Sequence, residues 1–469
     1  MIINKDDVLN DIKQKPDKHF NIIYCDGPYN LGSEWIIKDG KFDLKKGSEF
    51  MEKWSALDGP MTETFFNESF RTLKDGGYLV MFGLDRQLGP LYYYATLAGF
   101  TPCQSLYWYF ISNFPKASDA SKNIDKVLGS ERIKGEPKKG SSQNRKGNFA
   151  ETYFERNKED KRIITYNEKS QSTLGQKYEG YKYSIAPLKQ VVETILVFQK
   201  PIKGSKVQHI IDAENDMTKH PGVIDVDGCR VPSKNMKEKE EDSSARFPAQ
   251  TFISDEAAEI IDEQSGKIKA TPNIGLDKYT DSNVGKTTGF KRGGETNYTD
   301  TGGASKILHH IKYEENEYDL YNYFPKVSTK ERNAGCDGLK SVHPTMKPIN
   351  LNKHILSLFK LPANHPDERI YIPFCGVFSE VIAAALVGYE NIECCEMSEE
   401  YIEIGKARYN HWLKDVSEKK VKLKGTAFNQ KEDNGSVYRL RKNWGGKLSP
   451  EEQLKADKQD QQKIDDFWE

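Results

Sequence analysis

Residues 21–30 read Asn-Ile-Ile-Tyr-Cys-Asp-Gly-Pro-Tyr-Asn, and they indicate the fold class more clearly than any other segment. It begins with an apolar run from Asn21 to Cys25, which predicts a buried strand. The run stops at Asp26, which is followed by a Gly-Pro turn and the ring of Tyr29. Open α/β sheets bind ligands just beyond the carboxyl ends of their strands. The stretch therefore predicts a sheet of parallel strands with an acid and an aromatic ring at its binding edge.

The sequence that follows continues to alternate between helix and strand patterns. Residues 61–73 carry large apolar side chains at helical intervals, and residues 78–82 form the next apolar run. Residues 91–98 favour a second helix, and residues 104–111 favour a strand that is rich in aromatic side chains. Alternation of this kind predicts an α/β fold with a parallel sheet.

The pattern changes after residue 111 and returns near residue 342. Residues 112–183 are polar with little periodicity, residues 193–199 predict a buried strand that returns to the sheet, and residues 201–340 are irregular. A second series then completes a doubly wound sheet. It comprises predicted helices at 350–359, 379–386 and 401–412 and predicted strands at 369–372 and 392–396.

The charge of the chain is balanced overall. Its 469 residues include 69 basic and 70 acidic side chains, for a formal net charge of -1. A chain of this length can bury a large core and hold two domains, or one domain with a large insertion. A balanced charge neither supports nor excludes a nucleic acid partner. By direct count, residues 111–180 hold 15 basic and 10 acidic residues, which indicates either a basic surface or a solvated loop.

The cysteines and the amino terminus indicate the compartment. The seven cysteines are odd in number and include no Cys-x-x-Cys pair, so we expect neither a metal site nor a disulfide framework. The first residues do not combine a basic segment with an apolar one, and no run approaches the roughly 18 apolar residues of a membrane span. These features predict a protein of the reducing cytoplasm that does not enter a membrane.

Two segments from opposite ends of the chain resemble the halves of one active site. Asp26-Gly27-Pro28-Tyr29 resembles the Asp-Pro-Pro-Tyr catalytic loop of amino-group DNA methyltransferases. Residues 372–379, Ile-Pro-Phe-Cys-Gly-Val-Phe-Ser, resemble the Asp-Pro-Phe-x-Gly-Ser-Gly-Thr loop with which that family binds S-adenosylmethionine. The order, with the catalytic half first, is that of the β group. The resemblance implies a doubly wound, Rossmann-like methyltransferase sheet in permuted order, with a large irregular target-recognition insertion.

The resemblance also implies a mechanism at the catalytic loop. Asp26 and the carbonyl of Gly27 would accept hydrogen bonds from an exocyclic amine, and Tyr29, after Pro28, would offer its ring to a base flipped out of the duplex. The methyl group would pass directly to the amine. Asp26 favours adenine N6 as the target, because family members that act on cytosine N4 often carry Ser there. Cytosine N4 remains the alternative.

The cofactor half is implied in the same way. The backbone at Phe374 and Gly376 would approach the methionine end of S-adenosylmethionine, and Glu396, after the next predicted strand, would bind the ribose hydroxyls. Residues 343–348, His-Pro-Thr-Met-Lys-Pro, match the family segment that lines the carboxylate end of the cofactor. The implied cofactor residues are Asp26, His343, Thr345, Lys347, Pro348, Phe374, Gly376, Ser379 and Glu396.

Further similarities point to methyltransferases common in phage and prophage sequences, with double-stranded DNA as the partner. Residues 1–200, with an inserted loop at 112–183, would form the catalytic half, and residues 341–415 the cofactor half. Residues 201–340 would read the target, and residues 416–469 would form a charged tail. A homodimer and a restriction partner are both left open. The candidates for DNA contact are Lys116, Lys122, Arg230, Arg246, Lys330 and Arg332.

A second interpretation is a non-catalytic DNA-binding or partner subunit that keeps the methyltransferase fold. Three departures from the family pattern support it. Gly27 replaces a proline, Ile372 replaces an acid, and Phe378 places a ring where the backbone should approach the cofactor. Asp26 and Glu396, which are retained, favour the enzyme.

Overall fold

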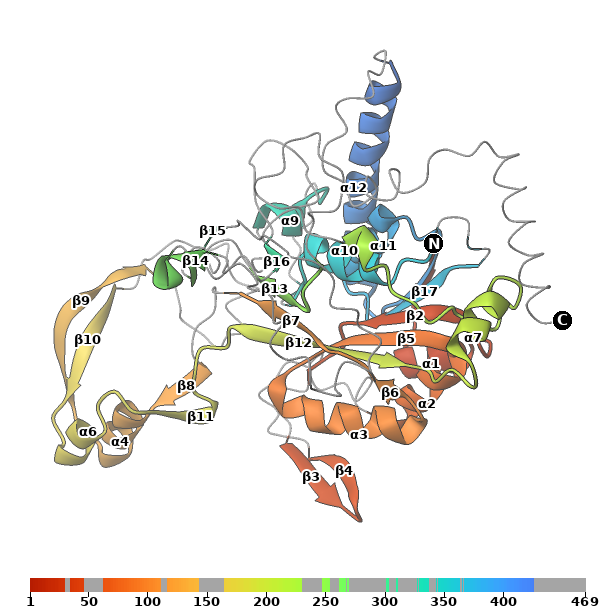
Figure 1. Cartoon of the computed structure of the whole chain (residues 1–469). Helices are drawn as coiled ribbons and strands as arrows, with labels where there is room; N and C mark the ends of the chain where they lie inside the picture. The colour runs from red at the N-terminus through yellow and green to blue at the C-terminus, as the bar shows by residue number, and fades with distance from the viewer. Residues whose placement is uncertain are drawn as a thin grey trace, which may run out of the picture.

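The computed structural model describes most of the chain outside the central insertion. The described residues are 1–29, 34–45, 62–110, 116–142, 164–229, 247–253, 261–266, 268–269, 301–302, 309–310, 327, 329–336, 343, 345–362, 365 and 367–425. This part forms an α/β structure in which helices cover both faces of one large sheet (Figure 1). None of its helices combines the length and the apolar character that crossing a bilayer requires.

The large sheet joins strands from both ends of the chain. Its order is β1-β18-β17-β2-β5-β12-β7-β13-β16, and β6 (Thr101–Pro102) also pairs with β12. The strands from β1 to β5 in this order are parallel, whereas β12 runs antiparallel to both β5 and β7. The bounds in chain order are β1 Ile2–Asn4, β2 Phe20–Cys25, β5 Leu73–Gly83, β7 Leu106–Tyr109, β12 Val192–Gln199, β13 Thr251–Ile253, β16 His309–His310, β17 Arg369–Pro373 and β18 Asn391–Cys395.

The pairing of β2 with β17 is the contact that brings the two ends of the chain together. Ile22 and Ile23 of β2 lie beside Ile370 and Tyr371 of β17, in parallel register. The carboxyl ends of β2, β17 and β18 therefore meet at one edge of the sheet. The permuted, doubly wound sheet expected from the sequence is confirmed.

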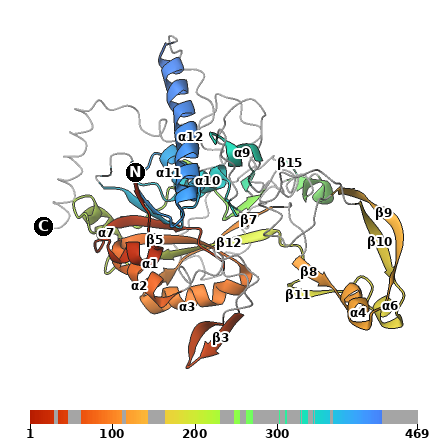
Figure 2. The same cartoon turned by 180° about the vertical axis from the view of Figure 1, so that it is seen from behind.

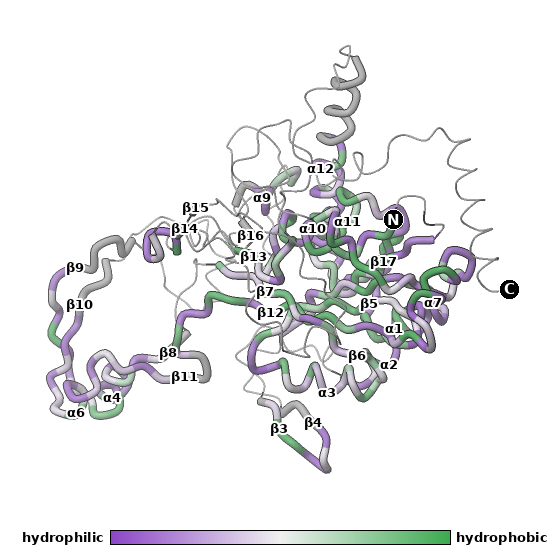
Figure 3. The backbone as a smooth tube through the Cα atoms, in the orientation of Figure 1, coloured by the Kyte–Doolittle hydropathy of each residue, from purple (hydrophilic) through white to green (hydrophobic). Residues whose placement is uncertain are grey.

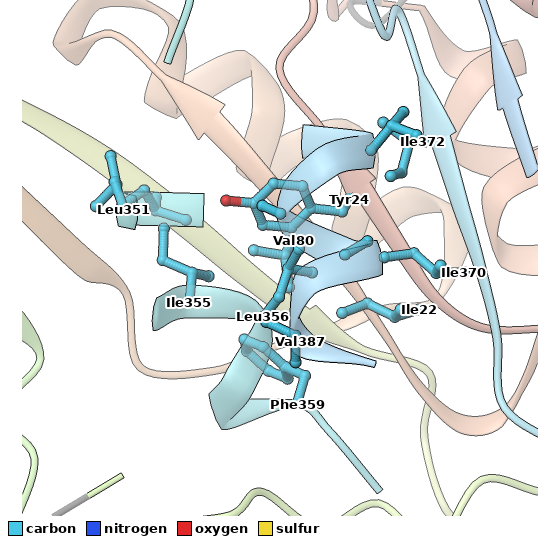
Figure 4. Packing of buried hydrophobic residues seen from close by; sticks show 14 of the residues in the cluster. Ile22, Tyr24, Val80, Leu351, Ile355, Leu356, Phe359, Ile370, Ile372 and Val387 are labelled. Carbon is cyan, nitrogen blue, oxygen red and sulfur yellow. The ribbon is translucent and has the colours of Figure 1, made fainter. Parts of the chain in front are cut away.

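Alternating side chains of the central strands fill two separate cores. Ile23 of β2 and Leu79 of β5 belong to the core beneath α1 (Val8–Lys13), α2 (Glu63–Thr72) and α3 (Leu88–Ala98). Ile22 and Val80 belong to the core beneath α10 (Ile349–Leu358), α11 (Ser379–Val387) and α12 (Glu399–Gly425) (Figure 4). Because successive residues of a strand point to opposite faces, a strand that is buried on both faces reads as a continuous apolar run.

The described part of residues 112–183 forms secondary structure in place of the expected loop. Together with β11 it makes a projection, residues 116–186, which we call the arm. It stands apart from the large sheet in Figures 1 and 2. Within it β8 pairs with β11 and β9 pairs with β10, all antiparallel. Its elements are β8 Lys116–Asp119, α4 Ala120–Leu128, β9 Arg132–Ser142, β10 Ile164–Ser170, α6 Thr173–Lys177 and β11 Lys182–Ala186.

A polar cluster lies where α4 and α6 meet one end of the ribbon formed by β9 and β10. The buried carboxylate of Asp125 accepts hydrogen bonds from the hydroxyls of Ser170, at 2.8 Å, and Ser172, at 2.6 Å, and pairs with Arg132. The tube in Figure 3 is mostly hydrophilic along the arm and mostly hydrophobic along the central strands. A two-stranded ribbon has no buried face that would impose an apolar period, which explains why the sequence pattern did not indicate the arm.

Residues 201–340 are described only in short pieces. β13 and β16 extend the large sheet, and β14 (Ile268–Lys269) pairs with β15 (Thr301–Gly302). The remaining elements include α7 Lys206–Ala213, η4 Asp227–Cys229 and α9 Thr329–Asn333. Near the amino terminus, β3 (Glu34–Lys38) and β4 (Lys41–Lys45) form a hairpin, and η3 (Asp85–Gln87) follows β5. Of the predicted charged tail at 416–469, residues 416–425 belong to α12 and residues 426–469 lie outside the described residues.

Candidate active site

A pocket opens where the carboxyl ends of β2, β17 and β18 meet. Its walls come from both halves of the chain, so the structure brings together the two segments that the sequence singled out. The residues that line it are Val8, Asp26, Gly27, Pro28, His343, Thr345, Met346, Phe374, Cys375, Gly376, Val377, Ser379, Glu380, Glu396, Met397 and Tyr401.

Asp26 lies directly after β2 and is held by a buried lysine. The ammonium of Lys347 donates to Asp26 Oδ1 at 2.6 Å and to the hydroxyl of Tyr29 at 2.8 Å. The Tyr29 hydroxyl in turn donates to Asp26 Oδ1 at 3.1 Å. Because Lys347, Tyr29 and Asp26 are each bonded to the other two, the Asp26 carboxylate is held in a fixed position. Both bonds to the carboxylate fall on Oδ1.

Glu193, at the start of β12, completes the surroundings of Lys347. Its Oε2 lies 3.6 Å from the lysine nitrogen. Burial by itself lowers the pKa of Lys347, but the charges of Asp26 and Glu193 outweigh burial and raise the pKa above the ordinary value. Lys347 is therefore a permanent cation between two carboxylates. The antiparallel direction of β12 brings Glu193 to this edge, because its first residues lie beside the carboxyl end of β5.

Tyr29 points into the protein. The residue is 7% exposed, belongs to the core beneath α10 and α11, and does not line the pocket. The side-chain amide of Gln87, a residue that the sequence did not indicate, donates to the Tyr29 carbonyl. The stacking of a base on this ring stays a prediction.

The turn after β17 needs glycine at one position. Gly376 has a φ of +47°, and a Cβ at this residue would lie 2.9 Å from Nε2 of His343. The Gly376 N–H donates to Oε2 of Glu396 at 3.0 Å, so the turn is tied to the end of the neighbouring strand. The absence of a side chain at Gly376 therefore lets the His343 ring pack against the turn, and both residues line the pocket.

Glu396 follows β18 at the same edge. Its Oε1 accepts from the N–H of Ser398 at 2.9 Å. Burial raises the pKa of this carboxyl, although the backbone N–H groups that donate to it act in the opposite direction. Each carboxylate oxygen can accept more than one hydrogen bond, so the group can still accept from hydroxyls of a ligand.

Phe378 does not fill the pocket. Its backbone is left-handed, with a φ of +68°, and its ring is fully buried against Gly405 of α12. The expected obstruction by this ring is therefore wrong. The same helix holds the turn through the buried Arg408, whose guanidinium donates to the carbonyl of Val377 and, at 3.2 Å, to the hydroxyl of Ser379.

His343 has a ring nitrogen that is available to a ligand. Within the described part of the chain its buried Nδ1 has no hydrogen-bond partner. Burial lowers the pKa of His343 to about 3, so the ring is neutral. Tyr401 packs edge-on against it, with 4.8 Å between ring centroids. Three features of the pocket therefore fit S-adenosylmethionine. The unpartnered Nδ1 of His343 and the turn at Gly376 would face its methionine end, and the carboxylate of Glu396 would face its ribose.

Two predicted cofactor residues do not line this pocket. Lys347 lies behind Asp26, and Pro348 precedes α10 as its N-cap residue. The sequence also missed several lining residues. Met346, Cys375, Glu380 and Met397 adjoin predicted site residues, and that adjacency was the available signal; Val8 comes from α1 and carried no signal.

Few candidates for DNA contact can be placed. Lys122 lies on the arm, where its ammonium pairs with Glu168 at 3.0 Å, and Arg332 lies in α9. The side chains of Lys116 and Lys330 lie outside the described residues, as do Arg230 and Arg246 altogether. DNA contact by these residues stays a prediction.

Comparison with known proteins gives one family. The family model for N6 and N4 methyltransferases, described as DNA methylase, matches residues 20–407. No curated protein matches the sequence. Among solved structures, the chain is similar to the cytosine-N4-specific PvuII DNA methyltransferase, with 12% identity and a TM-score of 0.38 over 94% of this chain and 89% of that chain. It is also similar to M1.HpyAVI in its SAM complex, with 12% identity and a TM-score of 0.32 over 87% and 98% of the two chains.

Proposed function

The chain belongs to the N6/N4 DNA methylase family, and from this premise we propose that it methylates the N6 amine of adenine in double-stranded DNA. Membership of the family carries the coarser activity, which is S-adenosylmethionine-dependent methylation of an amino group in DNA. The observation that supports the proposal best is the shared pocket. Asp26 and Gly27 line it from one side, and Gly376 and Glu396 line it from the other.

The chemistry begins with a weak nucleophile. The lone pair of an exocyclic amine is delocalised into the ring of the base. Asp26 Oδ2 and the Gly27 carbonyl would accept the two amine hydrogens, and this would favour a tetrahedral nitrogen whose lone pair is free. S-adenosylmethionine held beside Gly376 and Glu396 would supply the methyl group, and its sulfonium sulfur would keep the electron pair of the carbon–sulfur bond. Asp26 then accepts the proton that the methylated nitrogen loses.

The position of Asp26 is set in advance by its neighbours. Lys347 and Tyr29 both bond Oδ1, so the carboxylate does not have to reorganise as charge develops on the amine. Preorganised electrostatic groups of this kind are commonly the largest contribution to catalysis. Gly27 replaces a proline of the family pattern, but every residue has a carbonyl, so the second acceptor is kept.

Adenine is the proposed base because position 26 is Asp rather than the Ser that cytosine-N4 members often carry. Cytosine N4 is the second candidate, since both amines present the same geometry to two acceptors. A non-catalytic subunit is less consistent with the site, because Phe378 leaves the pocket open and the Asp26 carboxylate is held in place.

Substitution of Asp26 tests the assignment. Asp26→Ala removes one of the two acceptors, and we expect the methyl transfer rate on duplex DNA to fall about 10²- to 10³-fold or more. Binding of S-adenosylhomocysteine, measured by calorimetry, should persist because Gly376 and Glu396 are untouched. Asp26→Asn, which keeps the volume and one acceptor oxygen, is the matched variant. Turnover by Asp26→Ala near the level of the unmodified protein would rule out the proposed role.

A further inference from the structure

The pocket is lined by three carboxylates. They belong to Asp26, Glu380 and Glu396, and the lining includes no Lys or Arg side chain within the part of the chain that the structure describes. Lys347 is close, but it lies behind Asp26 and is engaged by Asp26 and Tyr29. A pocket with this distribution of charge favours a ligand that carries positive charge.

Glu380 is the carboxylate whose role the mechanism leaves open. It lies in the first turn of α11 and is 6% exposed. Its Oε1 accepts from the side-chain amide of Asn352 at 3.1 Å, and the carbonyl oxygen of that amide accepts from the Tyr24 hydroxyl at 2.8 Å. This chain of hydrogen bonds orients the carboxylate at the wall of the pocket.

The surrounding cations do not fully offset the cost of burying the negative charge of Glu380. Burial is the main cause that raises its pKa to about 7, and the negative charge of Asp26 raises the pKa further. Lys347 acts in the opposite direction, and Arg408 of α12 is a further cation that interacts with Glu380. A buried carboxylate without its own ion pair costs free energy, and a cation bound in the pocket would offset that cost.

Glu380 supplies the pocket with a carboxylate that position 372 does not supply. The family pattern has an acid where this chain has Ile372, and the Ile372 side chain is fully buried in the core beneath α10 and α11. Position 372 therefore cannot offer a charge to the pocket. Glu380 brings a carboxylate to the same pocket from the helix that follows the turn.

We propose that Glu380 binds the α-ammonium group at the methionine end of S-adenosylmethionine. Glu396 then takes the ribose hydroxyls, and Asp26 is left to the amine of the base. The inference rests on the proposed function, because it concerns the same pocket, and it adds a residue that recognises one functional group of the cofactor.

Calorimetric binding of two ligands to Glu380→Gln tests this role. The first ligand is S-adenosylhomocysteine, and the second is its analogue whose α-amino group is replaced by hydrogen. At pH 8, where Glu380 is ionised, we expect Glu380→Gln to weaken S-adenosylhomocysteine about tenfold or more and to leave the analogue unchanged. Glu396→Gln is the matched control, and it should weaken both ligands because both carry the ribose.

Each other outcome overturns the inference in a distinct way. Equal loss for both ligands in Glu380→Gln would give the residue only a structural role. Unchanged binding of S-adenosylhomocysteine would show that its ammonium group does not contact Glu380. In both cases the unmodified protein still binds the cofactor product and the proposed function stands. Absence of binding to the unmodified protein would instead remove the proposed function together with the inference.

Discussion

The ring of Phe378 lies against Gly405 of α12, which has no side chain to displace it. A Cβ on Gly405 would lie 2.5 Å from the ring, so the two residues are complementary. The left-handed backbone of Phe378 turns the ring away from the pocket, at a cost of the order of 1–3 kcal/mol for a residue with a side chain. A bulky side chain at this position is therefore compatible with an open cofactor site.

Complementarity between Phe378 and Gly405 can be measured as a coupling energy. We expect Gly405→Ala to lower the free energy of unfolding by about 1–2 kcal/mol, because the clash outweighs the gain in helix propensity. In a Phe378→Gly background the same change should be neutral or stabilising, since the ring is gone. Urea unfolding of the four proteins gives the coupling energy. Additive effects of the two substitutions would contradict the contact.

Residues of the site were predictable where the signal was local. Asp26, Gly376 and Glu396 each follow a strand, and a short motif surrounds each of them. Other roles depend on contacts that no local pattern encodes. Lys347 meets Asp26 across 321 positions of sequence, and the direction of the Phe378 ring depends on α12.

The connection between β7 and β12 defines how the arm is attached. Tyr109 of β7 and Val192 of β12 are antiparallel partners, and the N–H of Phe110 donates to the carbonyl of Val191 at 2.9 Å. The arm thus leaves and returns at neighbouring points of the sheet. Its described strands pair with one another and not with the large sheet. We therefore expect the arm to be separable from the pocket.

Deletion of the arm tests whether it contributes to DNA binding without contributing to cofactor binding. We expect a variant in which an Asn-Gly turn replaces residues 111–190 to fold, because such a turn joins antiparallel strands. It should bind S-adenosylhomocysteine as the full chain does. Its affinity for duplex DNA should fall tenfold or more at low salt, since the region holds a basic surplus. Fluorescence anisotropy with a labelled duplex measures the change, and unchanged DNA affinity would exclude the arm from the interface.

Strands and helices with at least one buried face could be predicted from the sequence, whereas the exposed two-stranded ribbons could not. The strands β2, β17 and β18 and the helices α2, α3, α10 and α11 match the apolar patterns, because burial imposes those patterns. The antiparallel direction of β12 was not predictable, since an apolar run does not show strand direction. The hairpin of β3 and β4 packs Trp35 and Phe42 against the core, but its strands are too short for their alternation to predict it. The arm lacks a dominant buried face, so its sequence showed no period.

At the scale of the whole molecule, the permuted order of the chain makes one site from its two ends. The parallel pairing of β2 with β17 places the catalytic loop beside the cofactor turn, although more than 300 residues separate them. The family model spans this whole interval, from residue 20 to residue 407. We therefore propose that the pocket at this edge transfers a methyl group to an amine of DNA.

Identification of the methylated nucleoside tests that claim most directly. The purified chain would be incubated with radiolabelled S-adenosylmethionine and mixed-sequence duplex DNA, and the DNA would be digested and its nucleosides separated. We predict label in N6-methyldeoxyadenosine, and none in a parallel reaction with Asp26→Ala. Label in N4-methyldeoxycytidine would keep the mechanism and replace the base. Duplex DNA that is bound but carries no label would contradict the claim and support a non-catalytic subunit.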